Sequence, residues 1–153
     1  MKKCLATAFA IGTLLTHACI FATANDIVGY WKTIDDHTHQ PKAVMQIYTQ
    51  NNLIYGKVVR GYPINGVVPH ETCPNCPAPF TNQPVNGMQV MWDLHYNPQT
   101  GDYEGGKILD PEAGHIYHVM LTPAKDGQSL QVRGYIGIPL IGRTQTWYRL
   151  ASS

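Results

Sequence analysis

The stretch Tyr103-Glu-Gly-Gly-Lys-Ile-Leu-Asp-Pro-Glu-Ala-Gly-His-Ile-Tyr117 is typical of two antiparallel strands joined by a tight turn. Asp110 and Pro111 begin the turn and Gly114 ends it, because proline presets the first turn position and glycine tolerates a positive φ. We expect Asp110 to cap this turn through its own side chain. The flanking residues include Ile and Tyr, which favour strands. The stretch therefore predicts a β-hairpin.

Similar turn signals recur at short intervals along the whole chain. They are separated by segments of about five to nine residues rich in Val, Ile, Tyr, Thr and Trp, which is the composition of strands. No stretch has a sustained helical period, so the pattern predicts an all-β barrel or sandwich. The other turn signals are Asp35-Asp36 with Pro41, Asn51-Asn52, Asn65-Gly66, Asn97-Pro98 to Gly101, and Asp126-Gly127.

Alternation of apolar and polar residues predicts which side chains face the interior. Glycines within these strands indicate sharp bends, which favour a single small antiparallel up-and-down β-barrel of about eight strands. A barrel of this size either fills with its own side chains or holds one small ligand. The predicted inward residues are Met88, Val90, Trp92 and Leu94; Tyr117, Val119 and Leu121; Leu130, Val132, Gly134 and Ile136; Ile54, Gly56 and Val58; and Gly106 with Ile108.

The longest interruption of this pattern runs from Gly61 to Pro84 and is rich in proline. Proline removes backbone donors, so the segment cannot form a regular central strand. It also contains the cysteine pair Cys73 and Cys76. We expect a lid or side loop beside the mouth of the barrel.

The N-terminus has the features of a secretory signal peptide. Two lysines precede an apolar run from Leu5 to Leu15 and the small-residue cleavage site Ala22-Thr23-Ala24. The apolar run is too short to span a bilayer. We therefore expect residues 1–24 to be removed and the mature protein to be periplasmic or secreted. Cys19, preceded by Ala18, leaves a lipoprotein anchor open as an alternative.

Residues 25–153 are expected to form one β-barrel domain, because this length supports one compact core. Without the two leader lysines, the 11 Lys and Arg fall to nine, against 10 Asp and Glu. A net charge near −1 gives the chain as a whole no electrostatic reason to bind nucleic acid or anionic lipid. No second long apolar run occurs, so the mature chain is expected to have no membrane span.

Two further stretches, Gly29-Tyr-Trp-Lys-Thr33 and the segment from Arg133 to Arg149, complete a pattern with the hairpin. Together they resemble the bacterial domain-of-unknown-function 2147 family, whose members look like small exported β-barrels related to lipocalins. The resemblance runs from about Ile27 to Arg149 and implies a lipocalin/calycin-like barrel. The family has no agreed catalytic set, so the resemblance implies no site residues. Its most specific parts are Gly-Gly-Lys-Ile-x-Asp-Pro-Glu-x-Gly at 105–114 and Gly-Arg-Thr-Gln-Thr-Trp at 142–147.

Gly29-x-Trp31 resembles the lipocalin start motif, and Arg149 is placed to cover that tryptophan. We expect this pair to close one end of the barrel and to be structural, because an Arg-Trp stack is a sufficient reason for both residues. The turn after this strand departs from the family's pattern, because His37 and His39 stand where an acidic or small polar turn is usual.

Cys73-Pro-Asn-Cys76 is the sharpest chemical motif. A CxxC in an exported chain most simply forms a disulfide, which would stiffen the proline-rich loop. Two alternatives stay open. A redox pair would need a lowered thiol pKa, and the thioredoxin-type setting is absent. A metal site would combine the two sulfurs with His70 and a further ligand such as His37 or His39.

The remaining polar residues do not form a catalytic set. Besides Ser152 and Ser153, the chain beyond the leader has one serine, Ser129, without a Gly-x-Ser-x-Gly elbow. Nearly all acidic residues sit in or beside predicted turns, so two facing carboxylates are not expected. His115 and His118 lie on opposite faces of one strand. We therefore expect no enzymatic activity, cofactor or metal; a solvated turn accounts for the grouping of Asp35, Asp36, His37 and His39.

The leading functional hypothesis is a lipocalin-like barrel that binds a small apolar or amphipathic ligand. The same interior would suit a packed core, so the alternative is an envelope interaction or stress-related module. Its contact candidates are Tyr62 and Phe80, and the protein partner is unknown. A redox or metal-binding protein centred on the cysteine pair is the third hypothesis. The expected ligand-binding residues are Met88, Val90, Trp92, Ile108, Tyr117, Val119 and Val132.

Overall fold

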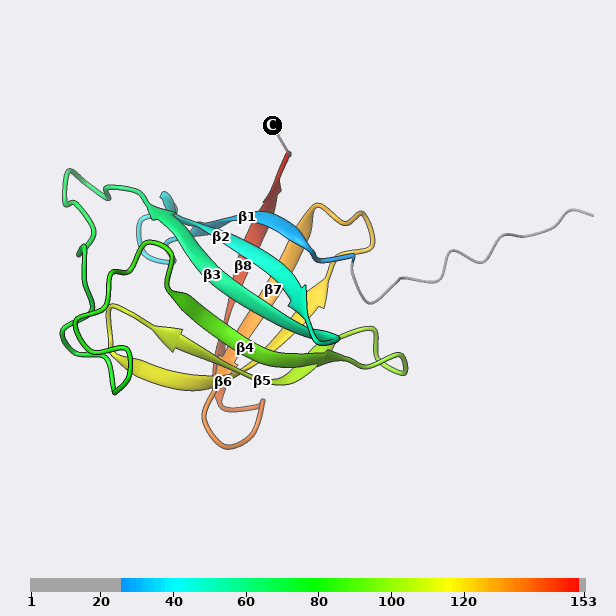
Figure 1. Cartoon of the computed structure of the whole chain (residues 1–153). Helices are drawn as coiled ribbons and strands as arrows, with labels where there is room; N and C mark the ends of the chain where they lie inside the picture. Colours follow the sequence, from blue (N-terminus) through cyan, green and yellow to red (C-terminus); the bar gives the residue numbers. More distant parts are fainter. Residues whose placement is uncertain (1–25, 152–153) are drawn as a thin grey trace, which may run out of the picture.

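In a computed structural model, the described residues, 26–151, form a closed barrel of antiparallel strands in the order β1-β2-β3-β4-β5-β6-β7-β8 (Figure 1). The predicted all-β, up-and-down barrel is confirmed. The predicted signal peptide, residues 1–24, and the alternative anchor at Cys19 lie outside the described residues. The strands are β1 Gly29–Ile34, β2 Pro41–Gln50, β3 Leu53–Gly61, β4 Gln89–Tyr96, β5 Tyr103–Asp110, β6 His115–Pro123, β7 Ser129–Tyr135 and β8 Gly142–Leu150.

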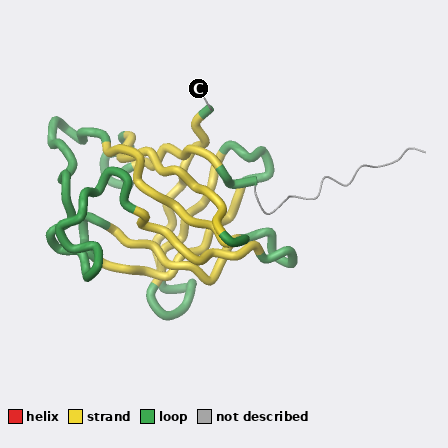
Figure 2. The backbone as a smooth tube through the Cα atoms, viewed as in Figure 1, coloured by secondary structure: helices red, strands yellow, loops and turns green. Residues whose placement is uncertain are grey.

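Short turns join most neighbouring strands, and Figure 2 shows them gathered beyond the ends of the strands. Asn51 and Asn52 connect β2 to β3 with φ angles of 50° and 62°. Asp110 caps the β5–β6 turn as predicted, since its Oδ1 accepts hydrogen bonds from the amides of Glu112 at 2.9 Å and Ala113 at 3.3 Å. No helix capable of spanning a bilayer occurs in the described part of the chain.

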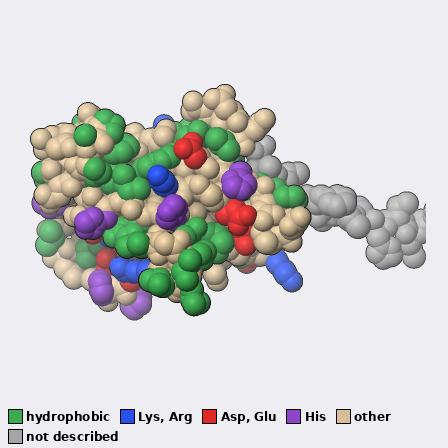
Figure 3. Space-filling model, turned by 90° about the horizontal axis from the view of Figure 1, so that it is seen from below, with side chains coloured by type: hydrophobic (Ala, Val, Ile, Leu, Met, Phe, Trp, Pro, Cys, Tyr) green, Lys and Arg blue, Asp and Glu red, His purple; other side chains and the backbone are tan. Residues whose placement is uncertain are grey.

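The turn between β7 and β8, residues 136–141, is absent from the predicted turns. Its residues are Ile, Gly, Ile, Pro, Leu and Ile, and this composition extends the apolar pattern of β7. Figure 1 shows the turn projecting below the barrel, and Figure 3 views the molecule from that side, where hydrophobic side chains gather on the surface. Gly137, with a φ of 73°, lets the chain reverse here.

One end of the barrel is closed by a tryptophan under an arginine. The Arg149 guanidinium lies 4.3 Å from the centre of the Trp31 ring. Arg149 donates hydrogen bonds to the carbonyls of Gly127 at 2.6 Å and Val28 at 3.1 Å, and to that of Asp26. The predicted pair therefore covers this end, called here the closed end, and ties the residues before β1 to the β6–β7 turn.

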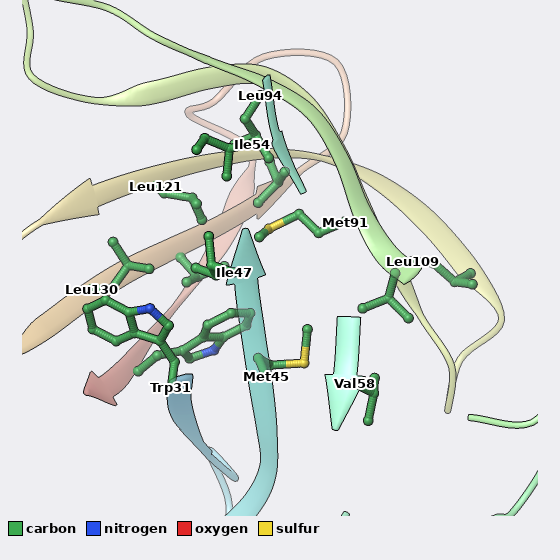
Figure 4. Close-up of a cluster of buried hydrophobic side chains, with 14 of the residues drawn as sticks. Trp31, Met45, Ile47, Ile54, Val58, Met91, Leu94, Leu109, Leu121 and Leu130 are labelled. Carbon is green, nitrogen blue, oxygen red and sulfur yellow. The ribbon is translucent and has the colours of Figure 1, made fainter. Parts of the chain in front are cut away.

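The interior above the closed end is tightly packed. Apolar side chains from seven strands, β1 to β7, point toward one another and exclude solvent (Figure 4). Glycines make this packing possible: a Cβ on Gly106 would lie 2.4 Å from Leu94 Cγ, and one on Gly56 would lie 2.7 Å from Met91 Cε. The side chains of this packed half are Trp31, Ile47, Ile54, Met91, Leu94, Tyr103, Val119, Leu121 and Leu130.

The predicted alternation fails in β4. The β3–β4 pairing contains register shifts and sets Met91 opposite Gly56 of β3. On its other side, Met91 lies opposite Ile108 of β5. Asp93 has a φ of 64°, a further irregularity in the strand. As a result Met91 is buried in the core, whereas Trp92 pairs with exposed Lys107 on the outer face. The inward position predicted for Trp92 is therefore wrong, because bulges shift the two-residue period.

The proline-rich segment forms a compact loop, residues 62–88, beside the other end of the barrel (Figure 2). The predicted disulfide joins Cys73 to Cys76. Cys73 Sγ lies 3.1 Å from the Pro111 carbonyl oxygen, and a Cβ on Gly114 would lie 2.2 Å from the Asn75 carbonyl oxygen. The loop therefore packs against the β5–β6 turn, and only glycine fits at position 114.

Candidate functional site

A cavity of about 760 Å³ opens at the end of the barrel opposite the closed end. We call this opening the mouth; the 62–88 loop and the β5–β6 and β7–β8 turns surround it. The volume lies within the range of small-molecule sites. Buried side chains from β2, β3, β4, β5, β7 and β8 form its floor: Met45, Val58, Val90, Leu109, Val132 and Trp147.

The cavity exists because small residues face the interior at the mouth. Ala43 of β2 and Gly134 of β7 both line it. A Cβ added to Gly134 would meet only Tyr117 Cβ, at 3.8 Å, which is ordinary contact. Gly134 therefore leaves space unfilled, unlike Gly106 in the packed half.

A chain of polar side chains runs along one wall of the cavity. Trp147 Nε1 donates to Gln145 Oε1 at 3.3 Å, and Gln145 Nε2 donates to Asp36 Oδ2 at 3.2 Å. The same Asp36 oxygen pairs with Arg143. Hydrogen bonds and an ion pair thus link the floor of the cavity to its rim. These side chains are held in place by one another and need no guest as a partner.

A second ion pair lies on the rim, between Lys42 of β2 and Glu112 of the β5–β6 turn at 2.7 Å. Because Glu112 and Arg143 are well exposed, both rim pairs are screened by water and stabilise the fold little. Their effect is to place both signs of charge around an apolar hollow.

The Asp35 side chain shapes the neighbouring β1–β2 turn. Its carboxylate accepts hydrogen bonds from the Thr38 amide at 2.8 Å and the Thr38 hydroxyl at 2.9 Å. These bonds lower the pKa of Asp35 below its ordinary 3.8. At the closed end the pKa of Tyr103 moves in the other direction: it is raised by burial and by the hydrogen bond that the Tyr103 hydroxyl donates to Asp26. Asp35 holds the backbone of its turn, whereas Tyr103 ties β5 to the residues before β1.

The predicted ligand-binding residues lie in four different places. Val90, Ile108, Tyr117 and Val132 line the cavity. Val119 lies in the packed half, and Met88, the last residue of the 62–88 loop, is buried beside a shallow hollow that Phe80 also lines. Trp92 lies outside the barrel, where its ring stacks on Phe80 at 5.8 Å between centroids. Sequence reasoning missed Met45, Leu109, Gln145 and Trp147, although alternation along 143–149 indicates that Gln145 and Trp147 share a face.

The aromatic contact candidates of the long loop are half-buried. Phe80 is covered by Trp92, and the Tyr62 ring lies 5.0 Å beneath the Arg60 guanidinium. Neither side chain is the freely exposed anchor that the sequence suggested, because each packs on a neighbouring strand residue.

The histidines and cysteines do not converge. Within residues 26–151, no group of three or more His, Cys, Asp or Glu side chains is arranged to hold a metal ion. The disulfide leaves neither Cys73 nor Cys76 as a thiolate, and both sulfur-bearing residues are buried. His70 borders the cavity, while His37 and His39 are exposed on the β1–β2 turn.

Comparison with known proteins agrees with this architecture. Residues 29–149 match the family described as "Uncharacterized protein conserved in bacteria (DUF2147)". Protein HP1028 from Helicobacter pylori, whose structure is described as belonging to the lipocalin family, superposes with a TM-score of 0.67 at 20% identity, over 82% of this chain and 83% of its own. No curated protein matches the sequence significantly. The chain belongs to the DUF2147 family, and its barrel has the lipocalin-like fold.

Proposed function

We propose that this protein binds one small apolar or amphipathic molecule in the mouth cavity. The observation that carries the proposal is a hollow of about 760 Å³, floored by buried apolar side chains, directly above a packed core. An apolar hollow of this size offers dispersion contacts to a guest that fits it. Binding an apolar molecule is therefore the favoured use of this end of the barrel.

The lining indicates how such a guest would lie. Its apolar part would contact Trp147, Val132 and Met45 on the floor, where burial of apolar surface drives binding. A polar end would remain at the rim beside Lys42 and Arg143. The chemistry that fits is a compact or single-chain amphiphile whose polar group stays near water.

We propose binding without catalysis. The two acidic residues that line the cavity are engaged: Asp110 caps its own turn, and Glu112 pairs with Lys42. This arrangement supports a carrier or scavenger.

We also propose that the protein acts outside the cytoplasm. The predicted leader at residues 1–24 supports export, and so does the disulfide between Cys73 and Cys76, because disulfides persist mainly in oxidising compartments. Ligands available there include membrane-derived amphiphiles, which match the cavity's lining.

The first test is native followed by denaturing mass spectrometry on protein purified gently from the periplasm. A guest that leaves on denaturation would reveal its mass, and a loss of two hydrogens would report the disulfide. A bare polypeptide mass in both conditions would contradict the proposal and favour the packed-barrel interaction module.

A pair of variants links the guest to the cavity. Gly134→Leu projects a side chain into the hollow, whereas Gln131→Leu places the same side chain on the outer face of the same strand. Guest retention should fall by at least about tenfold in the first and stay unchanged in the second. Equal retention in both would place the guest elsewhere.

A further inference from the structure

The β7–β8 turn presents four exposed apolar side chains in a run of six residues, and Leu140 is the most exposed large hydrophobic residue of the described part of the chain. Ile136, Ile138, Leu140 and Ile141 are 67%, 55%, 84% and 67% exposed. The intervening Gly137 and Pro139 add no polar side chain. A protruding apolar turn is costly in water unless something covers it.

The turn is held rigidly by hydrogen bonds. Ile136 donates to the Ile141 carbonyl at 3.2 Å, and Ile141 donates to the Ile138 carbonyl at 3.0 Å. Arg133 donates to the carbonyls of Pro139 at 2.6 Å and Leu140 at 3.2 Å. Four successive carbonyls, 138 to 141, are therefore satisfied within the protein. Backbone that enters a lipid layer must be satisfied in this way, because hydrocarbon offers no partners.

One cation without an ion pair among the described residues, Arg133, lies at the base of the turn. Strands β6, β7 and β8 contain no Asp or Glu, and Arg143 of β8 pairs with Asp36 of the β1–β2 turn. Within residues 26–151 Arg133 forms no ion pair; its remaining donor bonds Thr144 at 2.8 Å. A guanidinium without a carboxylate, set behind an apolar tip, complements a layer whose surface is phosphate and whose interior is hydrocarbon.

The same turn borders the cavity. Ile136 and Ile141 belong to its lining, as do Val67 and Val68 of the 62–88 loop, each 71% exposed. Apolar side chains therefore extend from the cavity wall to the outermost surface of the mouth. Whatever apolar surface covers the tip would also face the opening.

We propose that the Ile136–Ile141 turn docks this protein onto an anionic phospholipid bilayer, with the tip in the interfacial layer and Arg133 at the depth of the phosphates. Burial of the four apolar side chains supplies the attraction, and the unpaired guanidinium of Arg133 favours anionic headgroups. The mouth then faces the membrane. The proposal does not depend on what the cavity holds.

Vesicle flotation tests this docking with the purified protein. Wild-type protein should float with vesicles that contain phosphatidylglycerol and less with vesicles of phosphatidylcholine alone, and added salt should weaken binding. The double variant Ile138→Asp with Leu140→Asp should partition at least about tenfold less. Gln99→Asp adds the same kind of charge to the exposed β4–β5 turn at the closed end and should float like wild type.

Thermal unfolding verifies that each variant folds, since both altered positions are exposed. Failure of the wild type to float with anionic vesicles, or equal flotation of the double variant, would overturn the proposal. So would a dimer in size-exclusion chromatography that the double variant converts to monomer while flotation is unchanged, because the tip would then be covered by a second copy.

Discussion

The two ends of this barrel differ although the same eight strands build both. At the closed end, glycines sit where neighbouring side chains leave no room, and Arg149 covers Trp31. At the mouth, Gly134 faces unfilled space and apolar turn residues are exposed. The difference teaches that alternation sets which side chains point inward, whereas their sizes across the sheet decide whether the interior is packed or hollow.

The largest expected effect is the loss of stability when a buried tryptophan is replaced, and this loss should differ between Trp31 and Trp147. Trp31→Ala should destabilise the protein by about 3–5 kcal/mol, because it leaves a void in the packed half and removes the support of Arg149. Trp147→Ala should cost less, since one side of Trp147 already borders the cavity. Urea unfolding at equilibrium measures both. Equal losses would mean that the two halves are packed alike.

A matched pair of glycine substitutions tests the same contrast with one methyl group. Gly106→Ala should cost about 1–3 kcal/mol, because the new Cβ would lie 2.4 Å from Leu94 Cγ and 2.6 Å from the Trp92 carbonyl oxygen. Gly134→Ala should change stability by less than about 1 kcal/mol, since its Cβ meets ordinary contact. Thermal unfolding of both variants measures the two changes in stability. A larger loss of stability in Gly134→Ala than in Gly106→Ala would contradict the prediction.

Removal of the disulfide should affect the mouth alone. Replacing Cys73 and Cys76 by serine should lower stability by at most about 2 kcal/mol, because the closed loop is short. Amide hydrogen exchange should speed up in the 62–88 loop and the β5–β6 turn, against which the loop packs, and stay slow around Trp31. Faster exchange at the closed end would show that the two ends are coupled.

The smallest expected effect is the change in stability at low pH that Asp35 of the β1–β2 turn causes. Folding lowers the pKa of Asp35, so its ionised form stabilises the turn at neutral pH, and this contribution is lost as pH falls below 3.8. The difference in Tm between wild type and Asp35→Asn should therefore be present at neutral pH and vanish in acid. A difference that grows on acidification would have the wrong sign.

Local features of the fold could be predicted from the sequence, whereas features that depend on a partner strand could not. The turn at 110–114 carries its own capping residue, and Trp31 with Arg149 follows a family pattern. Met91 faces the interior instead of Trp92 because of how β4 pairs with β3 and β5. The alternation of residues within β4 alone cannot predict this pairing.

The cavity was partly predictable for the same reason. Val90, Ile108, Tyr117 and Val132 were identified by alternation, and all four line the hollow. Whether they enclose space depends on Ala43 and Gly134, which are small residues on strands far apart in sequence. The 136–141 turn was missed because its isoleucines have the composition of a strand.

The positions of the three tryptophans give this protein an optical use. Trp31 lies under a guanidinium at the closed end, Trp92 lies beneath the long loop against Phe80, and Trp147 floors the cavity. Each indole therefore samples a different polarity, and variants that keep one tryptophan and replace the others by phenylalanine would give separate emission spectra. Loop motion, cavity filling and loss of the core could then be followed in one molecule without an added dye.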